Sequence, residues 1–414
     1  TSPVGGETWA VGSLHAITWN AIGQPDTLVQ AEASTDGGKT WATVGKAPAG
    51  TGAILWKAPD TLTDRCLVRL SAPRVATTQS RALSIIASQE VKNYRWTQVA
   101  KQAEFAPRDG AGALVSRGKM FLIGGWNPGD KKHFPRICNN EVWSSADGSK
   151  WTLEKKNTFL DRTFDPALDW EGRHTAGYVV YKDRMWIVGG DVNQGHYHND
   201  VWNSADGKEW VFVNKGKAVP WRSRALHYTL VFKDRIWIMG GQTVPQFAKA
   251  PEAFHRDIWR TGDGVNWEQV KPREPYWSAR GMIGGAAVFK DRMWILGGGT
   301  YDTPNVKTRS FYNDVWSSGD GIAWTRHAEK TPWQPRQYHD VAVFDRRLWV
   351  MEGYSLKGNR NDVWYSSDGV NWYEVPKTPW KGRHAASVFV HDAALWIVAG
   401  NNMESDVWKL QGSR

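Results

Sequence analysis

Short apolar runs separated by turn residues are the dominant pattern of this chain. In residues 224–241 the runs Tyr-Thr-Leu-Val-Phe and Ile-Trp-Ile-Met flank a Lys-Asp-Arg turn, and two glycines close the second run. A third run starts at Ile258 and a fourth at Trp267, with a Thr-Gly-Asp-Gly turn between them. Short runs rich in β-branched and aromatic residues predict strands. The pattern therefore predicts a four-stranded antiparallel sheet joined by tight turns.

The same unit occurs six times, and repeats of this kind decide the fold. Each unit opens with an aromatic residue followed three positions later by arginine. The pairs are Phe105/Arg108, Trp170/Arg173, Trp221/Arg224, Trp277/Arg280, Trp333/Arg336 and Trp380/Arg383. The last unit lacks a fourth strand, and residues 94–99, before the first unit, match the missing piece. We therefore predict a six-bladed β-propeller over residues 91–414, closed by the pairing of 94–99 with blade six.

Residues 1–90 lack this unit and are predicted to form a separate domain. They contain several short apolar runs separated by turn residues, for example residues 54–56 and 66–70. This spacing is typical of a β-sandwich, and the region resembles immunoglobulin or fibronectin domains. The predicted fold class is thus all-β, with a small β-sandwich followed by the propeller, and the polar stretch 88–93 as the linker.

The repeats resemble the kelch family. Two glycines end the second strand in four of the units, at 124–125, 189–190, 240–241 and 297–298, and a spaced tryptophan follows. The resemblance covers residues 94–414 and implies kelch-type blades. The Ser-x-Asp-Gly-x-x-Trp turns are similar to the Asp-box of sialidases, although one residue shorter. Such boxes normally lie far from the chemistry, so we expect these turns to be structural.

Charge and composition narrow the function classes. The formal net charge is +10, but the repeat places basic residues one per blade, so no nucleic-acid partner is expected. No apolar run approaches the roughly 18 residues of a membrane helix, and we expect no membrane span. The start at Thr1, without methionine, and the two β domains predict a secreted or periplasmic protein, and we favour a monomer. A disulfide between Cys66 and Cys138 stays open, because it would have to join the two domains.

One face of the propeller is predicted to bind the ligand. In a four-stranded meander the start of the first strand and the end of the second lie at the same end, so the arginines share a face with the variable loops. Each arginine can serve packing, or it can bind an acidic ligand as equivalent arginines of kelch propellers often do. The predicted ligand-binding arginines are Arg108, Arg173, Arg224, Arg280, Arg336 and Arg383. Tyr301 lies in a variable loop and Trp126 alone departs from the tryptophan pattern, so both are predicted to contact the ligand.

Histidines on the predicted inner strands suggest proton transfer. His174 and His384 follow a repeat arginine by one position, whereas His227 and His339 follow one by three. All four offsets are odd, which predicts side chains on the same face of the inner strands. Glu352 replaces a glycine of the double-glycine pattern in blade five. The predicted catalytic residues are Tyr338, His339, Glu352, His384 and His227, with His174 and Tyr228 as further ligand contacts.

These groups suit the removal of a proton next to a carboxylate. Arginines that hold the carboxylate of a sugar would raise the acidity of its α-proton, and tyrosine, histidine or glutamate can remove that proton. We therefore expect an anionic carbohydrate, carboxylated or sulfated, as the ligand and an epimerase or lyase as the activity. The chain resembles the N-acetylneuraminate epimerases of the kelch class in blade number.

Two other functions stay open. Galactose oxidase is similar in having a kelch-like propeller and an extra β domain, and this likeness implies a metal-dependent oxidase in which Tyr338, His339 and His384 are candidate ligands. Its cofactor also needs a cysteine on an inner segment, whereas Cys138 lies in a variable loop. His196 and His198 are a second candidate metal pair, and no cofactor is predicted. A propeller that binds a glycan or a protein without catalysis is the other alternative.

Overall fold

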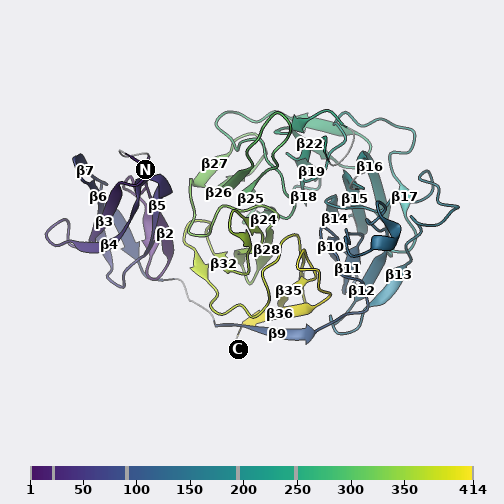
Figure 1. Ribbon diagram of the computed structural model, residues 1–414, viewed down its shortest axis with the longest axis horizontal. Helices are drawn as coiled ribbons and strands as arrows, with labels where there is room; N and C mark the ends of the chain where they lie inside the picture. The colour runs from purple at the N-terminus through teal and green to yellow at the C-terminus, as the bar shows by residue number, and fades with distance from the viewer. Residues whose placement is uncertain (1, 21–23, 89–92, 193–195, 247–249, 413–414) are drawn as a thin grey trace. The chain divides into compact units, whose positions relative to one another are not determined.

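The computed structural model describes residues 2–20, 24–88, 93–192, 196–246 and 250–412. The chain divides into two compact units. One comprises Thr1–Lys92, Ala328–Gln334 and Trp364–Glu374, and the other comprises Asn93–His327, Pro335–Val363 and Val375–Arg414. Nearly all regular structure in both units is strand, which confirms the all-β prediction (Figure 1). Within the described ranges, no helix has the length and apolar character that a membrane crossing requires.

Within the first unit, the residues before 89 form two sheets, the arrangement that a small β-sandwich has. Its larger sheet has the order β1-β8-β6-β3-β4, with β7 paired to β6, and its smaller sheet pairs β2 with β5. These strands are β1 (Thr8–Ala10), β2 (Leu14–Thr18), β3 (Leu28–Ser34), β4 (Ala42–Pro48), β5 (Ala53–Lys57), β6 (Thr63–Ala72), β7 (Val75–Gln79) and β8 (Leu83–Ile86). Every second residue of β3, namely Val29, Ala31 and Ala33, is buried in the core, because successive side chains of a strand point to opposite faces.

Most of the remaining strands form six four-stranded antiparallel sheets, the blades of a β-propeller, while β20 pairs with β21 and β30 with β31 in two small two-stranded sheets. Blade one runs from β10 (Gly112–Ser116) to β13 (Thr152–Lys155), and blade two from β14 (Gly177–Tyr181) to β17 (Val211–Phe212). Blade three consists of β18 (Tyr228–Val231), β19 (Ile236–Met239), β22 (Ile258–Thr261) and β23 (Trp267–Val270). Blade four runs from β24 (Ala286–Phe289) to β27 (Thr325–Ala328). Blade five consists of β28 (Asp340–Phe344), β29 (Arg347–Met351), β32 (Val363–Ser366) and β33 (Tyr373–Glu374). Blade six consists of β34 (Ser387–His391), β35 (Ala394–Val398), β36 (Val407–Gly412) and β9 (Tyr94–Ala100).

The blades close into a ring. Their first strands contact one another in a complete cycle, β10-β14-β18-β24-β28-β34 and back to β10 (Figure 1). Although β9 precedes blade one in the sequence, it pairs with β36 as the outer strand of blade six. The two ends of the propeller segment therefore share one sheet, so opening the ring would break the hydrogen bonds of that sheet.

Each repeat arginine ties together the strands of its own blade. Arg173 donates to the carbonyl of Gly189 at 2.7 Å and, through both terminal nitrogens, to Asp200 at 2.7 and 2.8 Å. The other five arginines also pair with the carbonyl at the first position of the double-glycine pattern and with an acidic residue two positions before the tryptophan of the third strand. These acidic partners are Glu141, Asp257, Asp314, Asp362 and Asp406. All six arginines are at most 1% exposed, so each is a desolvated cation whose charge is matched within its own blade.

Candidate functional site

A ring of backbone hydrogen bonds surrounds the propeller axis. The residue two positions after each repeat arginine has a positive φ between 50° and 79°, although only the first of the six is glycine. The ring residues are Gly110, Thr175, Leu226, Met282, Tyr338 and Ala385. The amide of Thr175 donates to the carbonyl of Gly110 at 3.1 Å, and equivalent bonds of 2.7 to 3.1 Å join four further neighbouring pairs. Adjacent blades thus fix this unfavourable backbone conformation, which L residues rarely adopt alone.

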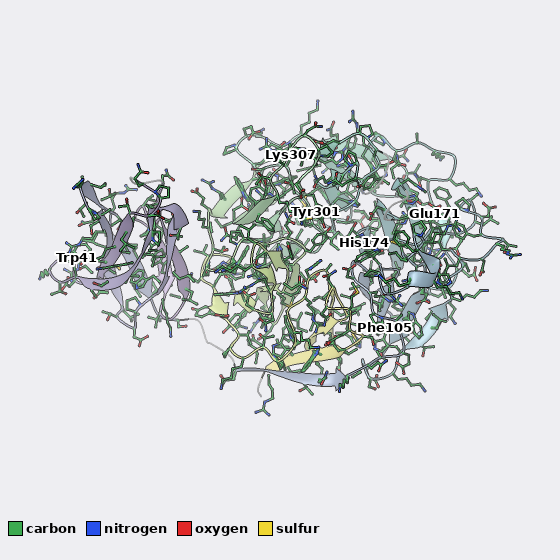
Figure 2. All side chains as sticks on the ribbon, in the orientation of Figure 1. Trp41, Phe105, Glu171, His174, Tyr301 and Lys307 are labelled. Atoms are coloured by element: carbon green, nitrogen blue, oxygen red, sulfur yellow. The ribbon has the colours of Figure 1, made fainter. Side chains whose placement is uncertain are left out.

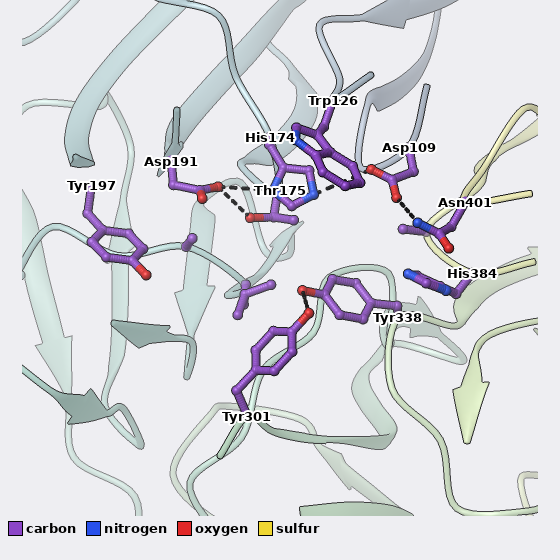
Figure 3. A pocket seen from close by; sticks show the side chains of 13 residues that line it. Asp109, Trp126, His174, Thr175, Asp191, Tyr197, Tyr301, Tyr338, His384 and Asn401 are labelled. Atoms are coloured by element: carbon purple, nitrogen blue, oxygen red, sulfur yellow. Dashed lines mark hydrogen bonds and ion pairs between the residues drawn. The ribbon is translucent and has the colours of Figure 1, made fainter. Parts of the chain in front are cut away.

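A pocket of about 310 Å³ lies against this ring, a volume in the lower range for small-molecule sites (Figure 3). Two equivalent repeat positions supply most of its polar side chains. The residue directly after the arginine contributes Asp109, His174 and His384, and the residue directly after the double glycine, or its equivalent, contributes Trp126, Asp191 and Asn401. Backbone bridges join the two positions within a blade, for example His174 to Asp191. The polar groups of blades six, one and two therefore converge on one volume.

His174 lies between two carboxylates. Its Nδ1 is 3.2 Å from Oδ1 of Asp191, and its Nε2 is 3.5 Å from Oδ1 of Asp109. Thr175 donates to the same oxygen of Asp191 at 3.0 Å, and Asn401 donates to Asp109 at 2.6 Å (Figure 3). Burial disfavours the imidazolium, but the charges of Asp191 and Asp109 outweigh it and raise the pKa of His174 to about 10. His174 is therefore a cation at neutral pH.

Two tyrosines form the opposite wall. The hydroxyl groups of Tyr301 and Tyr338 are 2.7 Å apart (Figure 3). Burial raises the pKa of Tyr301 to about 12, and burial together with the neighbouring Tyr301 raises the pKa of Tyr338 further above the ordinary range. Gln242 positions Tyr301 by accepting from its amide at 2.9 Å and donating to its carbonyl at 3.2 Å. Both phenols stay protonated at neutral pH and can donate to a ligand.

His384 is a neutral imidazole at the edge of the same pocket. Its Nδ1 is 2.7 Å from Oδ1 of Asn359, and because that oxygen can only accept, Nδ1 carries the proton. Nε2 is then the unprotonated nitrogen. Burial lowers the pKa of His384 to about 4, and the positive charge of His174 acts in the same direction. The ring of His384 lies 5.3 Å from that of Tyr338, so a base and a hydrogen-bond donor are neighbours.

Other predicted site residues lie away from this pocket. The six repeat arginines do not line it, and their guanidinium groups are engaged by carbonyls and carboxylates. His339 is fully buried and donates from Nε2 to the carbonyl of Leu296 at 2.7 Å. Tyr228 donates to the carbonyl of Gly281 at 2.8 Å. These contacts tie His339 and Tyr228 to the backbone between blades.

A second, inner cavity of about 200 Å³ contains His227 and Asp340 among its lining residues. Burial lowers the pKa of His227 to about 3, so this histidine is neutral. Glu352 is fully buried, with a φ of 51°, and its carbonyl accepts from Arg336 at 2.7 Å. Burial and the charge of Asp340 raise the pKa of Glu352 well above its usual range.

In each blade the ring residue with positive φ lies between the two positions that carry these histidines, which we expected to share one face. His174 and His384 precede it and line the outer pocket, whereas His227 and His339 follow it and are buried deeper. Strand alternation applies only along continuous strand, and a residue with positive φ between the two positions interrupts it. The odd offsets therefore do not bring the four imidazoles together.

Asp109, Asp191, Tyr197 and Asn401 line the pocket but were not among the predicted site residues. A signal was present for three of them, since each occupies the position after a repeat arginine or after the double glycine. These are the positions that supply His174 and Trp126. Comparing the six residues at each position would have shown the polar cluster of blades six, one and two.

His196 and His198 lie on the outer part of blade two. Both are close to Glu171, with Nε2 of His196 at 2.8 Å and Nε2 of His198 at 3.0 Å from the same carboxylate oxygen. Figure 2 shows Glu171 farther from the middle of the propeller than His174 and Tyr301. The other predicted metal candidates, His339 and His384, do not share a cavity, because only His384 lines the outer pocket. Cys66 and Cys138 are buried free thiols.

Comparison with known proteins adds no relative. No protein-family model matches the chain, and no curated protein matches it at a significant level.

Proposed function

We propose that the outer pocket binds a carbohydrate and transfers a proton to and from a carbon atom of that ligand, as an epimerase or a lyase does. The observation that carries this proposal is the pairing of a neutral base with protonated phenols in one pocket. His384 offers an unprotonated Nε2, and the hydroxyl groups of Tyr301 and Tyr338 are neighbouring donors. General acid–base catalysis needs both kinds of group within reach of one ligand.

These protonation states determine the role that each residue has in the proposed reaction. Nε2 of His384 takes the proton from a carbon next to a carbonyl or carboxylate group. In the tyrosine pair one hydroxyl donates to the other, which leaves one hydroxyl proton for the ligand. That proton is placed to stabilise the negative charge that develops on the ligand oxygen. Return of a proton to the carbon gives epimerisation, and loss of a leaving group at the next carbon gives elimination.

The other pocket residues favour a hydroxyl-rich ring. Asp109 and Asp191 can accept from sugar hydroxyl groups, and Trp126 offers an apolar face with its ring 6.0 Å from that of His174. His174 is the positive charge available to an acidic group, although its two carboxylate neighbours offset it. We therefore keep the carboxylated sugar as the proposed ligand but no longer assign its recognition to the six arginines.

The finer fold assignments belong to the same proposal. We infer that the blades are of kelch type, because the paired glycines that suggested this, such as Gly189 and Gly190, have φ values of 57° and 100°, which favour glycine. We likewise infer that the N-terminal sandwich is immunoglobulin-like. Export of the protein stays a prediction from the sequence.

The test is deuterium exchange into a sugar in D₂O, followed by proton NMR. The probes are glucuronate, galacturonate and N-acetylneuraminate, with glucose and galactose as neutral partners. We expect loss of a carbon-bound proton signal from at least one acidic sugar, and more than 100-fold slower exchange in His384→Ala and Tyr338→Phe. His391→Ala is the matched control, since His391 lies at the other end of strand β34 and contacts the carbonyl of Ala146. Binding of a sugar without exchange would identify a binding protein instead.

A further inference from the structure

We propose that Glu171, His196 and His198 form a binding site for a divalent transition-metal ion, with zinc as the ion whose ligand preferences fit best. The two imidazoles approach one carboxylate oxygen at 2.8 and 3.0 Å, and their ring centres are 4.5 Å apart. All three potential ligand atoms lie within 4.8 Å of one another. Two imidazole nitrogens and one carboxylate oxygen are a ligand set that zinc accepts.

The spacing of these atoms fits a tetrahedral ion. Ligands bound at 2.0 to 2.1 Å from a tetrahedral zinc lie about 3.3 Å from one another. The two nitrogen–oxygen distances, 2.8 and 3.0 Å, are shorter than that value by about half an ångström or less. Binding would therefore need only a small outward movement of side chains that already converge.

The backbone presents the two histidines together. His198 lies in strand β16 (Tyr197–Ser204) and His196 directly precedes that strand, and both imidazoles contact the same oxygen of Glu171. Tyr197 lies between them and lines the outer pocket, where its hydroxyl donates to the carbonyl of Val244 at 3.1 Å. Glu171 comes from the segment just before Arg173, which the clamp to Asp200 fixes. The three ligands are thus held by two segments of one blade.

A second carboxylate lies near His198. Its Nδ1 is 3.6 Å from Oδ2 of Asp200, a separation longer than a hydrogen bond, on the side of the ring away from Glu171. His196 is 54% exposed, which leaves a path for the ion and for a water ligand in the fourth position.

The test is titration of metal-free protein with Zn²⁺ by isothermal calorimetry. We expect one ion per chain, and at least 10-fold weaker binding in His196→Ala and in Glu171→Gln. His196→Ala is the safest variant because this side chain is half exposed, and circular dichroism checks that each variant is folded. His133→Ala is the matched control: His133 pairs with Asp130 at 2.7 Å, but the described residues place no third ligand there. Co²⁺ then replaces Zn²⁺, and its visible absorption should show four-coordination.

The alternative is an ordinary ion pair of two histidines with one carboxylate. Wild-type protein that binds no Zn²⁺ at micromolar concentrations would establish that alternative and overturn the proposal. Equal zinc affinity of the wild type and of the double variant Glu171→Gln/His196→Ala would also overturn it, because the ion would then bind elsewhere. None of these measurements depends on activity, so the result is independent of the function proposed for the outer pocket.

Discussion

The buried carboxyl pair of Glu352 and Asp340 should make the stability of the protein fall as the pH rises. Glu352 occupies a position that is glycine in four other blades and alanine in blade six. It is fully buried and forms no well-aligned side-chain hydrogen bond with another described residue. Burial raises the pKa of Asp340 to about 7, and burial with the charge of Asp340 raises the pKa of Glu352 well above its usual range. Burial opposes ionisation of both carboxyl groups.

The direction in which stability changes with pH follows from the number of protons that the folded and unfolded chains bind. Both folded-state pKa values exceed the unfolded values, so the folded chain holds more protons, and the stabilisation present below about pH 4 is lost as the pH rises. Each pH unit between the two pKa values of a group costs about 1.4 kcal/mol. For Asp340 the interval from 3.8 to about 7 spans roughly three units, or about 4 kcal/mol in all.

Glu352→Gln removes the acid whose ionisation is opposed both by burial and by the charge of Asp340. We expect this variant to be about 2 to 4 kcal/mol more stable than the wild type at pH 8, and within about 1 kcal/mol of it at pH 4.5. Guanidinium chloride unfolding from pH 4.5 to 8.5, monitored by tryptophan fluorescence, measures the difference. Glu209→Gln, at an exposed position, is the control and should leave the pH dependence unchanged. If Glu352→Gln has the same pH dependence as the wild type, Glu352 is ionised in the folded protein and the reasoning is wrong.

Three further predictions concern charges and thiols. Arg280→Ala should destabilise the protein by about 3 to 5 kcal/mol in the same unfolding assay, because it leaves the carboxylate of Asp314 uncompensated. Arg260→Ala, which breaks a pair of a partly exposed arginine with the exposed Glu268, should cost less than about 1 kcal/mol. Nitrogen-15 NMR should show the imidazole of His174 protonated up to pH 8. The contribution of this imidazolium to the stability of the protein should be complete below pH 6.5 and should be lost as the pH approaches 10. Titration near pH 6.5 would contradict the ion pairs with Asp109 and Asp191. Burial raises the pKa of Cys138 well above its usual range, so this thiol should react with DTNB only after unfolding.

The propeller was predictable because its determinants are local and repeated. Each strand is a short apolar run, and each turn is made of residue types that favour turns, as in residues 232–236 and 261–264. Six copies of one pattern set the number of blades. The match of residues 94–99 to the missing strand also suggested the pairing of β9 with β36 that the structure contains. Such reasoning needs little knowledge of distant contacts, because five of the six blades are built from consecutive residues.

The site was less predictable because it depends on contacts between blades. Leu226 and Tyr338 have positive φ, which their residue types do not suggest, and the hydrogen bonds of the axial ring hold that conformation. The strand alternation read from sequence therefore failed at this point. The repeat arginines were ambiguous for another reason, since their counter-ions, such as Asp257, lie 33 residues away along the chain.

The pocket is asymmetric although the fold repeats six times. Blades six, one and two contribute charged and amide groups, among them Asp109, His174 and Asn401, while blade three contributes Ala225 and Leu226 to the same lining. Tyr301 and Tyr338 add phenol rings on a further side (Figure 3). A ligand in such a pocket must turn its hydrogen-bonding edge toward blades six, one and two, which fixes one orientation relative to His384. Equivalent backbone positions in the blades define the shape of the pocket. The different side chains at those positions allow the pocket to distinguish one face of a ligand from another.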